Sequence, residues 1–404
     1  MKDFPRSENI GSAASIQSAA AEFMTLAQQK DIIASYGADL FGISLETFMN
    51  WRWQMKHQIS NAAEAKRILE LSSSEEAGFT ELNELFQTGI TPYYLSLMKQ
   101  QISEHGEADC PIRRQALPRQ EELQDQMGLK DPLQEVDHSP VREVVHVYPD
   151  RVAFCVAQLC PVYCRYCFRK RRDDEVGLHF NRNVVQRGLD YIRSQPAIRD
   201  VLITGGDPFI ASDSALESLL QQIREIPHVE IIRFGTRTPV TLPYRVTAKL
   251  AKIISQFHPV WLNTHFNCVE EITPEAELAV ANLVNHGIPV GNQAVLLKGV
   301  NDTPKKMLDL CRGLLKIRVR PYYVFHPHYV EGTEHLRVSL RQGMEIMKSL
   351  RGNITGFGIP TYALDTPHGK IPIQHNYMLG EDGDDILVET IRGEIWREKG
   401  ILAP

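Results

Sequence analysis

The stretch CPVYCRYC at residues 160–167 brings three cysteines into a run of eight residues. Thiolate sulfur is a soft ligand that suits zinc or iron–sulfur clusters. A structural zinc site needs a fourth ligand to complete its tetrahedron, and His179 or Cys268 could supply it. On a four-iron cube, three cysteines would instead leave one iron open to chelate a small molecule. The spacing therefore predicts a metal centre and leaves both kinds open.

From residue 152 onward, short apolar runs rich in β-branched residues alternate with amphipathic stretches. The runs cover residues 152–157, 201–204, 231–234, 260–265, 290–295 and 320–325. The amphipathic stretches cover residues 183–193, 215–225, 247–256, 274–286 and 304–315. Strands that alternate with helices are typical of a parallel sheet with helical crossovers. Six such runs suit a partial or complete βα barrel better than a small doubly wound sheet.

Glycine, histidine and charged residues gather directly after several of these runs. They form the groups Gly205-Gly206-Asp207-Pro208, Gly235-Thr236-Arg237, His265-Phe266-Asn267 and His326-Pro327-His328. Active sites of βα barrels lie at the C-terminal ends of the strands. Because the cysteine motif also follows an apolar run, the sequence predicts a single site at this edge of the barrel.

The chain outside the barrel has a helical texture at its N-terminal side. Residues 15–30 and 61–71 have a helix-forming composition. Residues 91–102 begin with a Thr-Pro pair, which is a helix-start signal. A charge-rich connection that contains proline follows from residue 116 to residue 140. We expect an N-terminal helical region at 1–140, a barrel core at 141–370, and a C-terminal segment at 371–404 that contacts another subunit.

The composition is that of a globular protein, with 43% hydrophobic residues, 23% charged residues and a formal net charge of −6. A nucleic-acid-binding protein would normally carry a basic stripe, so the charge argues against that class. The one dense basic run, residues 169–172, directly follows the cysteine motif. Its position favours a wall that binds an anion over an ordinary solvated loop.

The sequence has neither a signal-peptide pattern in its first thirty residues nor a later apolar run that approaches a membrane span. Its seven cysteines are odd in number and clustered. In a reducing compartment such a set indicates metal binding or catalysis rather than disulfides. We therefore expect a cytoplasmic protein.

The C-x3-C-x2-C spacing, with Tyr166 just before the last cysteine, resembles the motif of the radical S-adenosylmethionine (SAM) superfamily. The resemblance implies that Cys160, Cys164 and Cys167 hold a [4Fe–4S] cluster whose open iron binds SAM. An electron passed to the sulfonium would give methionine and a 5′-deoxyadenosyl radical. The resemblance also implies that the loop Gly205-Gly206-Asp207 pairs with the amino group of SAM, since bare glycines let the backbone approach a ligand closely.

Further stretches narrow the resemblance. They read ITPYYLSLM (90–98), CPIRRQALP (110–118), YPDRV (148–152), GTRTPVTLP (235–243), NTHFN (263–267), GNQAVLLKGVND (291–302), VRPYY (319–323) and DTPHGK (365–370). Together, from about residue 90 to about residue 390, they resemble the lysine 2,3-aminomutase family, which also uses pyridoxal phosphate. The implied fold is α/β, a partial (β/α)6-type radical SAM barrel with an N-terminal helical extension and a C-terminal segment that binds pyridoxal phosphate.

By this resemblance, Lys370 forms the Schiff base with pyridoxal phosphate, a role open to a lysine whose environment frees the amine. Arg151 contacts the cofactor phosphate, with Tyr148 nearby. Arg169 grips the substrate carboxylate, for which the guanidinium fork is suited. Three strand-end residues either line the adenosyl pocket or form ordinary strand-end hydrogen bonds: Asn263, His265 and Gln293.

The sequence departs from the family pattern at the substrate side chain. The lysine enzymes hold the far ammonium with two aspartates, of which one matches Asp365 and the other falls on His328. Loss of one charge-assisted hydrogen bond costs about 1.5–3 kcal/mol. That is enough to change substrate preference about tenfold or more. Asp365 still argues for a cationic substrate, and His328 could suit a planar guanidinium, so lysine and arginine both stay open.

Two other departures concern zinc and the cofactor phosphate. Thr303 stands where the clostridial-type enzymes carry a zinc-binding cysteine, and no cysteine follows Cys311, so we expect no zinc. Val147 stands where the lysine enzyme has an arginine just before YPDRV. Phosphate binding is therefore expected to be weaker or differently arranged.

Three functions follow from these observations. The first is a 2,3-aminomutase that converts lysine or arginine into its β-amino isomer and regenerates SAM. The second keeps the cofactors but desaturates or otherwise oxidises the amino acid, consuming SAM stoichiometrically. The third is a non-catalytic zinc-binding barrel. For an enzyme, the expected partners are the amino acid, a flavodoxin- or ferredoxin-type electron donor, and further copies of the chain.

Overall fold

The computed structural model describes residues 32–82, 85–106, 110–170 and 182–402. Its centre is a nine-stranded sheet whose strands lie in sequence order. β2 to β8 are parallel, and β1 and β9 pair antiparallel at the two ends. The strands are β1 (Val144–Tyr148), β2 (Arg151–Ala157), β3 (Asp200–Gly205), β4 (Ile231–Gly235), β5 (Val260–Thr264), β6 (Val290–Val295), β7 (Arg320–Phe325), β8 (Thr361–Thr366) and β9 (Gly369–Pro372).

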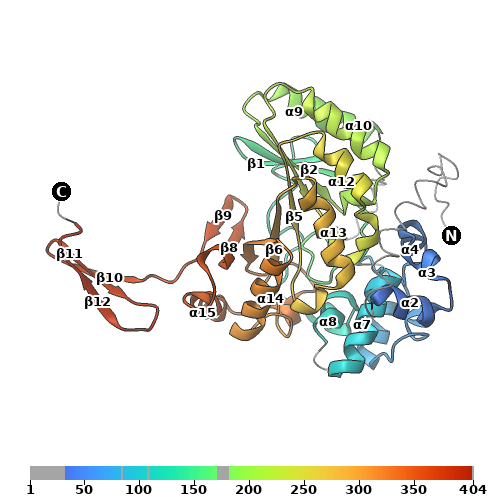
Figure 1. Ribbon diagram of the computed structural model, residues 1–404, viewed down its shortest axis with the longest axis horizontal. Helices are drawn as coiled ribbons and strands as arrows, with labels where there is room; N and C mark the ends of the chain where they lie inside the picture. Colours follow the sequence, from blue (N-terminus) through green and yellow to red (C-terminus); the bar gives the residue numbers. More distant parts are fainter. Residues whose placement is uncertain (1–31, 83–84, 107–109, 171–181, 403–404) are drawn as a thin grey trace.

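Helices connect the parallel strands and cover the outside of the sheet (Figure 1). They are α9 (Arg182–Ser194), α10 (Asp213–Arg224), α12 (Ala248–Ser255), α13 (Pro274–Asn285), α14 (Pro304–Lys316) and α15 (Leu340–Leu350), with the short α11 (Thr238–Thr241) before α12. The prediction of an α/β, partial (β/α)6-type barrel is confirmed: every predicted apolar run forms a strand, β2 to β7, and each is followed by a helix.

Local sequence explains where these elements begin. In α13 the side chain of Thr273 accepts a hydrogen bond from the Ala276 N–H, and Pro274 takes the first helical position. The same Thr-Pro arrangement starts α14 and α7 (Pro92–His105), so the helix predicted at residues 91–102 is confirmed. In β2, buried Val152, Phe154 and Val156 alternate with half-buried residues, because one face of the strand packs under α9.

Other parts of the chain differ from the prediction or were missed. The helix expected at residues 61–71 is reduced to α5 (Ala62–Ala65), which Asn61 caps. The residues directly after α5 form turns. The helix expected at residues 15–30 lies outside the described residues. The strands β1, β8 and β9 were not predicted, because they are short and carry polar residues between their apolar ones.

The N-terminal helices lie against one side of the barrel (Figure 1). They are α2 (Ile33–Phe41), α3 (Leu45–Met49), α4 (Trp51–Lys56), α5, α6 (Ser73–Glu81), α7 and α8 (Pro111–Ala116). Buried hydrogen bonds tie them to the barrel: the Ala34 N–H donates to Glu275 Oε1 at 2.9 Å, and the hydroxyls of Tyr93 and Thr273 lie 2.7 Å apart. One hydrophobic core runs through both parts.

The C-terminal segment forms a separate three-stranded antiparallel sheet that projects from the body (Figure 1). Its strands are β10 (Met378–Asp382), β11 (Asp385–Glu389) and β12 (Ile395–Glu398). Ile395 is 69% exposed and Trp396 is 58% exposed, so its apolar side chains lack a covering layer in the single chain.

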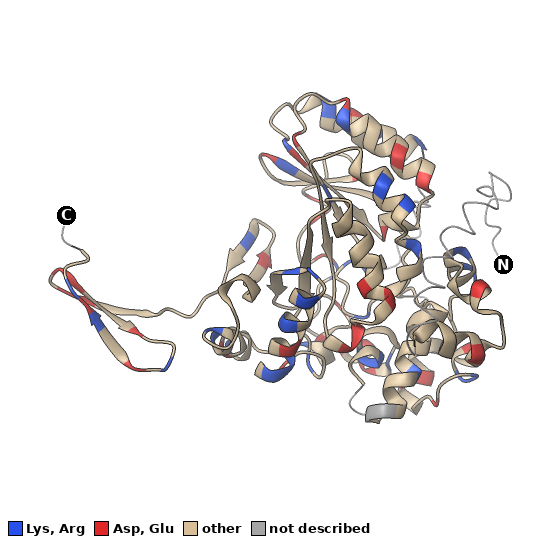
Figure 2. Cartoon of the chain, viewed as in Figure 1, with Lys and Arg blue, Asp and Glu red and all other residues tan. Residues whose placement is uncertain are grey.

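Charges and hydropathy agree with the compositional analysis. In Figure 2, lysine and arginine residues are interspersed with aspartate and glutamate residues over the visible helices. Among the residues that the structure describes, no helix combines the length and apolarity needed to cross a membrane.

Candidate active site

The cysteine motif forms a loop directly after β2, and the N-terminal region holds this loop in place. Gln58 donates from Nε2 to the carbonyl oxygens of Cys160 and Pro161, at 2.8 and 2.7 Å. The Tyr163 N–H donates to the Gly89 carbonyl at 3.0 Å, and the Arg165 N–H donates to the Gln115 carbonyl at 2.8 Å. The N-terminal helices therefore shape the metal-binding loop as well as covering the barrel.

A network of buried charged residues stabilises the same loop from inside the protein. Glu122, fully buried, accepts from Arg165 Nε at 2.9 Å and from Lys170 Nζ at 2.9 Å. Lys170 also donates to the Gly332 carbonyl at 2.7 Å, and burial lowers its pKa to about 8. The expectation that the basic run forms an anion-binding wall is thus wrong for Lys170, whose ammonium is occupied inside the protein. Residues 171 and 172 of that run lie outside the described residues.

The loop brings the three thiols close enough to affect one another. Burial raises the pKa of the Cys160 thiol well above its usual range, and repulsion from Asp207 and then from Cys167 and Cys164 adds to this. Burial and Cys164 raise the pKa of Cys167 to about 11. All three cysteines are half-buried and free of disulfides, and their role as ligands of one metal centre, whose positive charge would replace the thiol protons, stays a prediction. Of the two candidate fourth ligands for zinc, Cys268 instead contacts the Gln115 side chain at 3.6 Å, and His179 lies outside the described residues.

The glycine-rich loop after β3 lies directly against the segment that leads into the cysteines. Gly205 has a φ of +117°, which favours glycine, and a Cβ on Gly206 would lie 2.5 Å from the Leu159 carbonyl oxygen. The Asp207 N–H donates to that same oxygen at 2.8 Å. The Asp207 carboxylate accepts from the Thr236 hydroxyl at 2.6 Å and the Arg237 N–H at 2.9 Å. The Asp207 side chain is therefore engaged within the protein, whereas Gly205 and Gly206 are half-buried.

The three residues predicted to line the adenosyl pocket lie in, or directly after, the neighbouring strands β5 and β6. Asn263 is buried in β5, and a side chain at Gly291 of β6 would approach its Oδ1 to 3.0 Å. His265 follows β5, and burial lowers its pKa to about 4, so the ring is neutral at physiological pH. Gln293 is half-buried in β6. That these three residues line the adenosyl pocket stays a prediction.

The predicted cofactor-binding residues meet where the two ends of the sheet approach each other. The Lys370 N–H, in β9, donates to the Tyr148 hydroxyl, in β1, at 2.7 Å. The Arg151 guanidinium lies over the Tyr148 ring at 3.6 Å and pairs with Asp150 at 2.8 Å. Tyr148, Arg151 and Lys370, far apart in sequence, thus form one group.

The predicted substrate-side-chain residues adjoin this group. Lys370 Nζ lies 3.2 Å from Asp365 Oδ2, and His328 Nε2 lies 3.6 Å from the same oxygen. Burial alone would raise the pKa of Asp365, but its contacts with His328 and Lys370 bring the pKa below the ordinary value. A cavity of about 360 Å³ opens beside this pair, and its walls include Met127 and Leu129. The cavity therefore combines apolar walls with one carboxylate.

Arg169 occupies a different part of this region. It pairs with Glu135 through both Nε, at 2.7 Å, and Nη2, and lies beside the Phe168 ring. Phe168 in turn contacts the His328 ring, with 5.0 Å between centroids. The structure thus connects the predicted carboxylate-binding arginine with the predicted side-chain pocket through one aromatic residue.

Comparisons with known proteins agree with this arrangement. The radical SAM superfamily model matches residues 155–311, and the model described as lysine-2,3-aminomutase matches residues 347–397. Over 353 residues the chain is 42% identical to the L-lysine 2,3-aminomutase of Bacillus subtilis (strain 168), covering 87% of this chain and 74% of that protein. The chain belongs to the lysine 2,3-aminomutase family.

Two other family members are nearly as similar. The L-lysine 2,3-aminomutase of Clostridium subterminale is 41% identical over 349 residues, covering 86% of this chain and 83% of that protein. The glutamate 2,3-aminomutase of Clostridioides difficile (strain 630) is 39% identical over 353 residues, covering 87% and 82%. The family therefore includes members named for a basic and for an acidic amino acid, at similar identity to this chain.

Membership of the family makes the chain a radical SAM amino acid 2,3-aminomutase, an isomerase, rather than a non-catalytic zinc-binding barrel. A radical SAM enzyme implies a [4Fe–4S] cluster and SAM. The glycine loop packs against the segment that leads into the cysteines, and the assignment of these residues to the cluster and to SAM stays a prediction.

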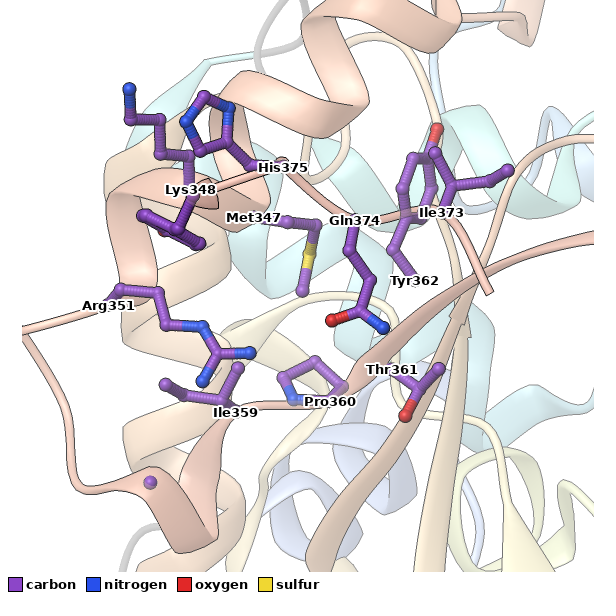
Figure 3. A pocket seen from close by; sticks show the side chains of 12 residues that line it. Met347, Lys348, Arg351, Ile359, Pro360, Thr361, Tyr362, Ile373, Gln374 and His375 are labelled. Carbon is purple, nitrogen blue, oxygen red and sulfur yellow. The ribbon is translucent and has the colours of Figure 1, made fainter. Parts of the chain in front are cut away.

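A second cavity, of about 270 Å³, lies apart from these residues, between α15 and the chain that follows β9 (Figure 3). Its walls include Lys348, Arg351 and His375. Lys348 and His375 both pair with Glu389 of β11, at 2.6 and 2.7 Å. This cavity therefore marks where the projecting sheet joins the body.

Several site residues were missed because nothing in the sequence near the cysteines points to them. Glu122 and Gln58 stand far before the motif and carry no recognisable spacing, whereas Gln115 lies in the stretch CPIRRQALP but had no role assigned to it. Arg237 had a signal: it belongs to a polar group that follows a strand, although no role was assigned to it. Tertiary contacts alone place these side chains on the cysteine loop.

Proposed function

We propose that this aminomutase moves the amino group of a basic α-amino acid from C2 to C3, with pyridoxal phosphate held at Lys370. The observation that carries the proposal is the position of Asp365, whose carboxylate lies 3.2 Å from Lys370 Nζ at the edge of a cavity with apolar walls. A carboxylate held ionised there favours a substrate whose side chain ends in a positive charge.

The residues around Lys370 fit pyridoxal phosphate. Lys370 supplies a primary amine, Arg151 supplies a guanidinium for the phosphate, and Tyr148 orients both through its ring and hydroxyl. Bound pyridoxal phosphate would carry the amino nitrogen while SAM supplies the hydrogen-abstracting radical. The pairing of Asp365 with Lys370 keeps the lysine side chain directed toward this group.

The proposed contacts bind the two ends of the amino acid, its α-carboxylate and its side-chain cation, with different residues. Arg169, oriented by Glu135, would bind the α-carboxylate through the donors that Glu135 leaves available. Asp365 would pair with the far cation, and apolar Met127 and Leu129 would contact the methylene chain. Because His328 replaces a second carboxylate, the side-chain cation keeps one strong ionic partner in place of two.

Lysine is the first substrate to test, because several relatives at about 40% identity are named for it. Arginine is the second, because the His328 ring beside Asp365 leaves an edge against which a planar guanidinium could lie. Glutamate would bring its negative side chain toward the Asp365 carboxylate, and the two charges would repel. Of the nearby described cations, Lys370 would be occupied by the cofactor and Arg169 by the α-carboxylate, so neither would offset this repulsion.

We further propose that the enzyme is a homo-oligomer whose subunits contact through β10 to β12. Exposed Met378, Leu379, Ile395 and Trp396 on this small sheet support the proposal, since a projecting apolar sheet is stabilised by a covering partner. The contact would then rest on apolar packing, without a zinc ion.

The test is anaerobic incubation of the reconstituted enzyme with SAM, pyridoxal phosphate and reductant, offering lysine, arginine, ornithine and glutamate together. The proposal predicts a β-isomer of unchanged mass from a basic amino acid, with little net 5′-deoxyadenosine. The Asp365→Asn variant should lose this preference, while Asp309→Asn, on the outer helix α14, should keep it. A β-isomer of glutamate alone would overturn the substrate assignment, and a product lighter by two hydrogens would overturn the isomerisation.

A further inference from the structure

Arg237, directly after β4, lies against the cysteine loop. It is 8% exposed, and its Nη1 donates to Cys164 Sγ at 2.8 Å. The ring of Tyr166, the residue before Cys167, lies 5.5 Å from the guanidinium carbon. A buried guanidinium thus contacts the sulfur of the middle cysteine of the motif.

The remaining donors of Arg237 are fixed by buried partners. Its Nη2 donates to Glu271 Oε1 and to Gln115 Oε1, each at 2.6 Å, and its Nε donates to the His265 carbonyl at 3.1 Å. Glu271 is fully buried and also accepts from the Tyr94 hydroxyl at 2.6 Å. These contacts hold the guanidinium in one orientation, with Nη1 toward the sulfur.

The backbone of Arg237 is fixed as firmly as its side chain. Its N–H donates to Asp207 Oδ2 at 2.9 Å, and the Asp207 N–H donates to the Leu159 carbonyl just before Cys160. The arginine, the glycine-rich loop and the cysteine loop therefore form one hydrogen-bonded unit.

We propose that Arg237 tunes the reduction potential of the iron–sulfur centre by donating a hydrogen bond to the Cys164 sulfur. The inference rests on the proposed assignment of Cys160, Cys164 and Cys167 as cluster ligands. Reduction adds one electron to the cluster and no other atom. An N–H donor and a positive charge at a ligand sulfur stabilise that added negative charge, so they make the cluster easier to reduce.

Glu271 gives the proposal a second prediction, of opposite sign. Its carboxylate partly offsets the charge of Arg237 at 2.6 Å. Replacing Glu271 with glutamine keeps an acceptor for Nη2 but removes the negative charge. The field of Arg237 at the sulfur would then be larger, and the potential would rise.

The test is an EPR-monitored redox titration of the anaerobically reconstituted enzyme, without SAM or amino acid. At fixed ambient potential, Arg237→Gln should lower the ratio of reduced to oxidised cluster about tenfold, which corresponds to about 59 mV for a one-electron couple. Arg237→Lys should give a smaller shift in the same direction, and Glu271→Gln a shift the other way. Arg245→Gln is the matched control: Arg245 is also buried, but it donates to the Phe209 and Ala211 carbonyls and not to sulfur.

The titration reports only protein that carries a cluster, so partial loss of iron in a variant leaves the potential measurable. Unchanged potentials in the Arg237 variants, or a shift shared by Arg245→Gln, would overturn the inference. Failure of the unsubstituted enzyme to bind iron at the three cysteines would instead overturn the proposed function itself.

Discussion

The backbone N–H of Lys370 donates to the hydroxyl of Tyr148 at 2.7 Å, and this bond joins β9 to β1, the last strand of the nine-stranded sheet to the first. The residue assigned to pyridoxal phosphate is therefore placed by the closure of the barrel. Gly369, with a φ of +118°, has no side chain that would obstruct the Tyr148 ring.

Tyr148→Phe should consequently weaken cofactor binding. The substitution removes the acceptor for the Lys370 N–H, at a cost of about 0.5–1.5 kcal/mol. We expect less pyridoxal phosphate per subunit after gel filtration, measured by absorbance. Tyr191→Phe is the control, because the Tyr191 hydroxyl bonds His146 in β1 but does not contact Lys370. Equal cofactor retention in both variants would contradict the role of this bond.

Glu122→Gln should destabilise the cysteine loop. It leaves the buried cations of Arg165 and Lys170 without their counter-charge, and breaking a buried pair in this way costs about 3–5 kcal/mol. We expect a lower melting temperature and a lower iron content per subunit. The neighbouring Glu121→Gln, outside that ion network, should retain iron; a Glu122→Gln protein with full iron content would show that the network does not support the loop.

Glu135→Gln tests whether Arg169 is held ready for the substrate carboxylate. Because Glu135 pairs with Nε and Nη2 of Arg169, its loss should leave the guanidinium disordered and raise the KM for the amino acid about tenfold, with a smaller change in kcat. Steady-state kinetics on the amino acid would measure this, with Glu230→Gln at an exposed pair as the control. A fall in KM would mean that Glu135 competes with the substrate.

His326 should make the protein sensitive to acid. Burial, and then the nearby His328, lower its pKa to about 4, so the folded protein keeps it neutral while the unfolded chain, with a pKa near 6.5, takes up a proton. The contribution of this group is therefore complete above about pH 6.5 and is lost as the pH falls toward 4. Between pH 7 and pH 5 the loss is about 2 kcal/mol.

Denaturant unfolding at the two pH values would measure this loss, and His326→Gln should reduce it. Glutamine can still bond the Tyr362 hydroxyl that lies 2.8 Å from His326 Nδ1. His368→Gln, an exposed histidine in the turn between β8 and β9, should leave the pH dependence unchanged. An equal pH dependence in the His326 variant and the parent would contradict the assignment.

The barrel strands could be predicted from sequence because most of them are short runs rich in apolar and β-branched residues, in which buried side chains alternate with half-buried ones. β8 and β9 gave no such signal: TYALDT and GKIP carry polar residues that face the site or solvent. The projecting sheet was missed for a related reason, since its side chains are not buried in the single chain.

The site divides in the same way. Roles for the cysteines and Lys370 could be predicted because these residues stand in compact motifs with a recognisable resemblance, and these roles stay predictions. Glu122 and Gln115 reach the cysteine loop directly, and Glu271 reaches it through Arg237, only through tertiary folding and across sequence separations that no local spacing encodes. Lys170 shows the reverse error, because a charge run read as a surface contains one buried structural cation.

The most direct test of the central claim is to follow the nitrogen itself. Lysine labelled with ¹⁵N at its α-amino group, incubated anaerobically with the reconstituted enzyme, should give a product in which ¹⁵N is bonded to C3 by NMR, with SAM largely preserved. Arginine labelled in the same way tests the alternative substrate. Label that remains on C2 while SAM is consumed in step with turnover would contradict amino-group migration.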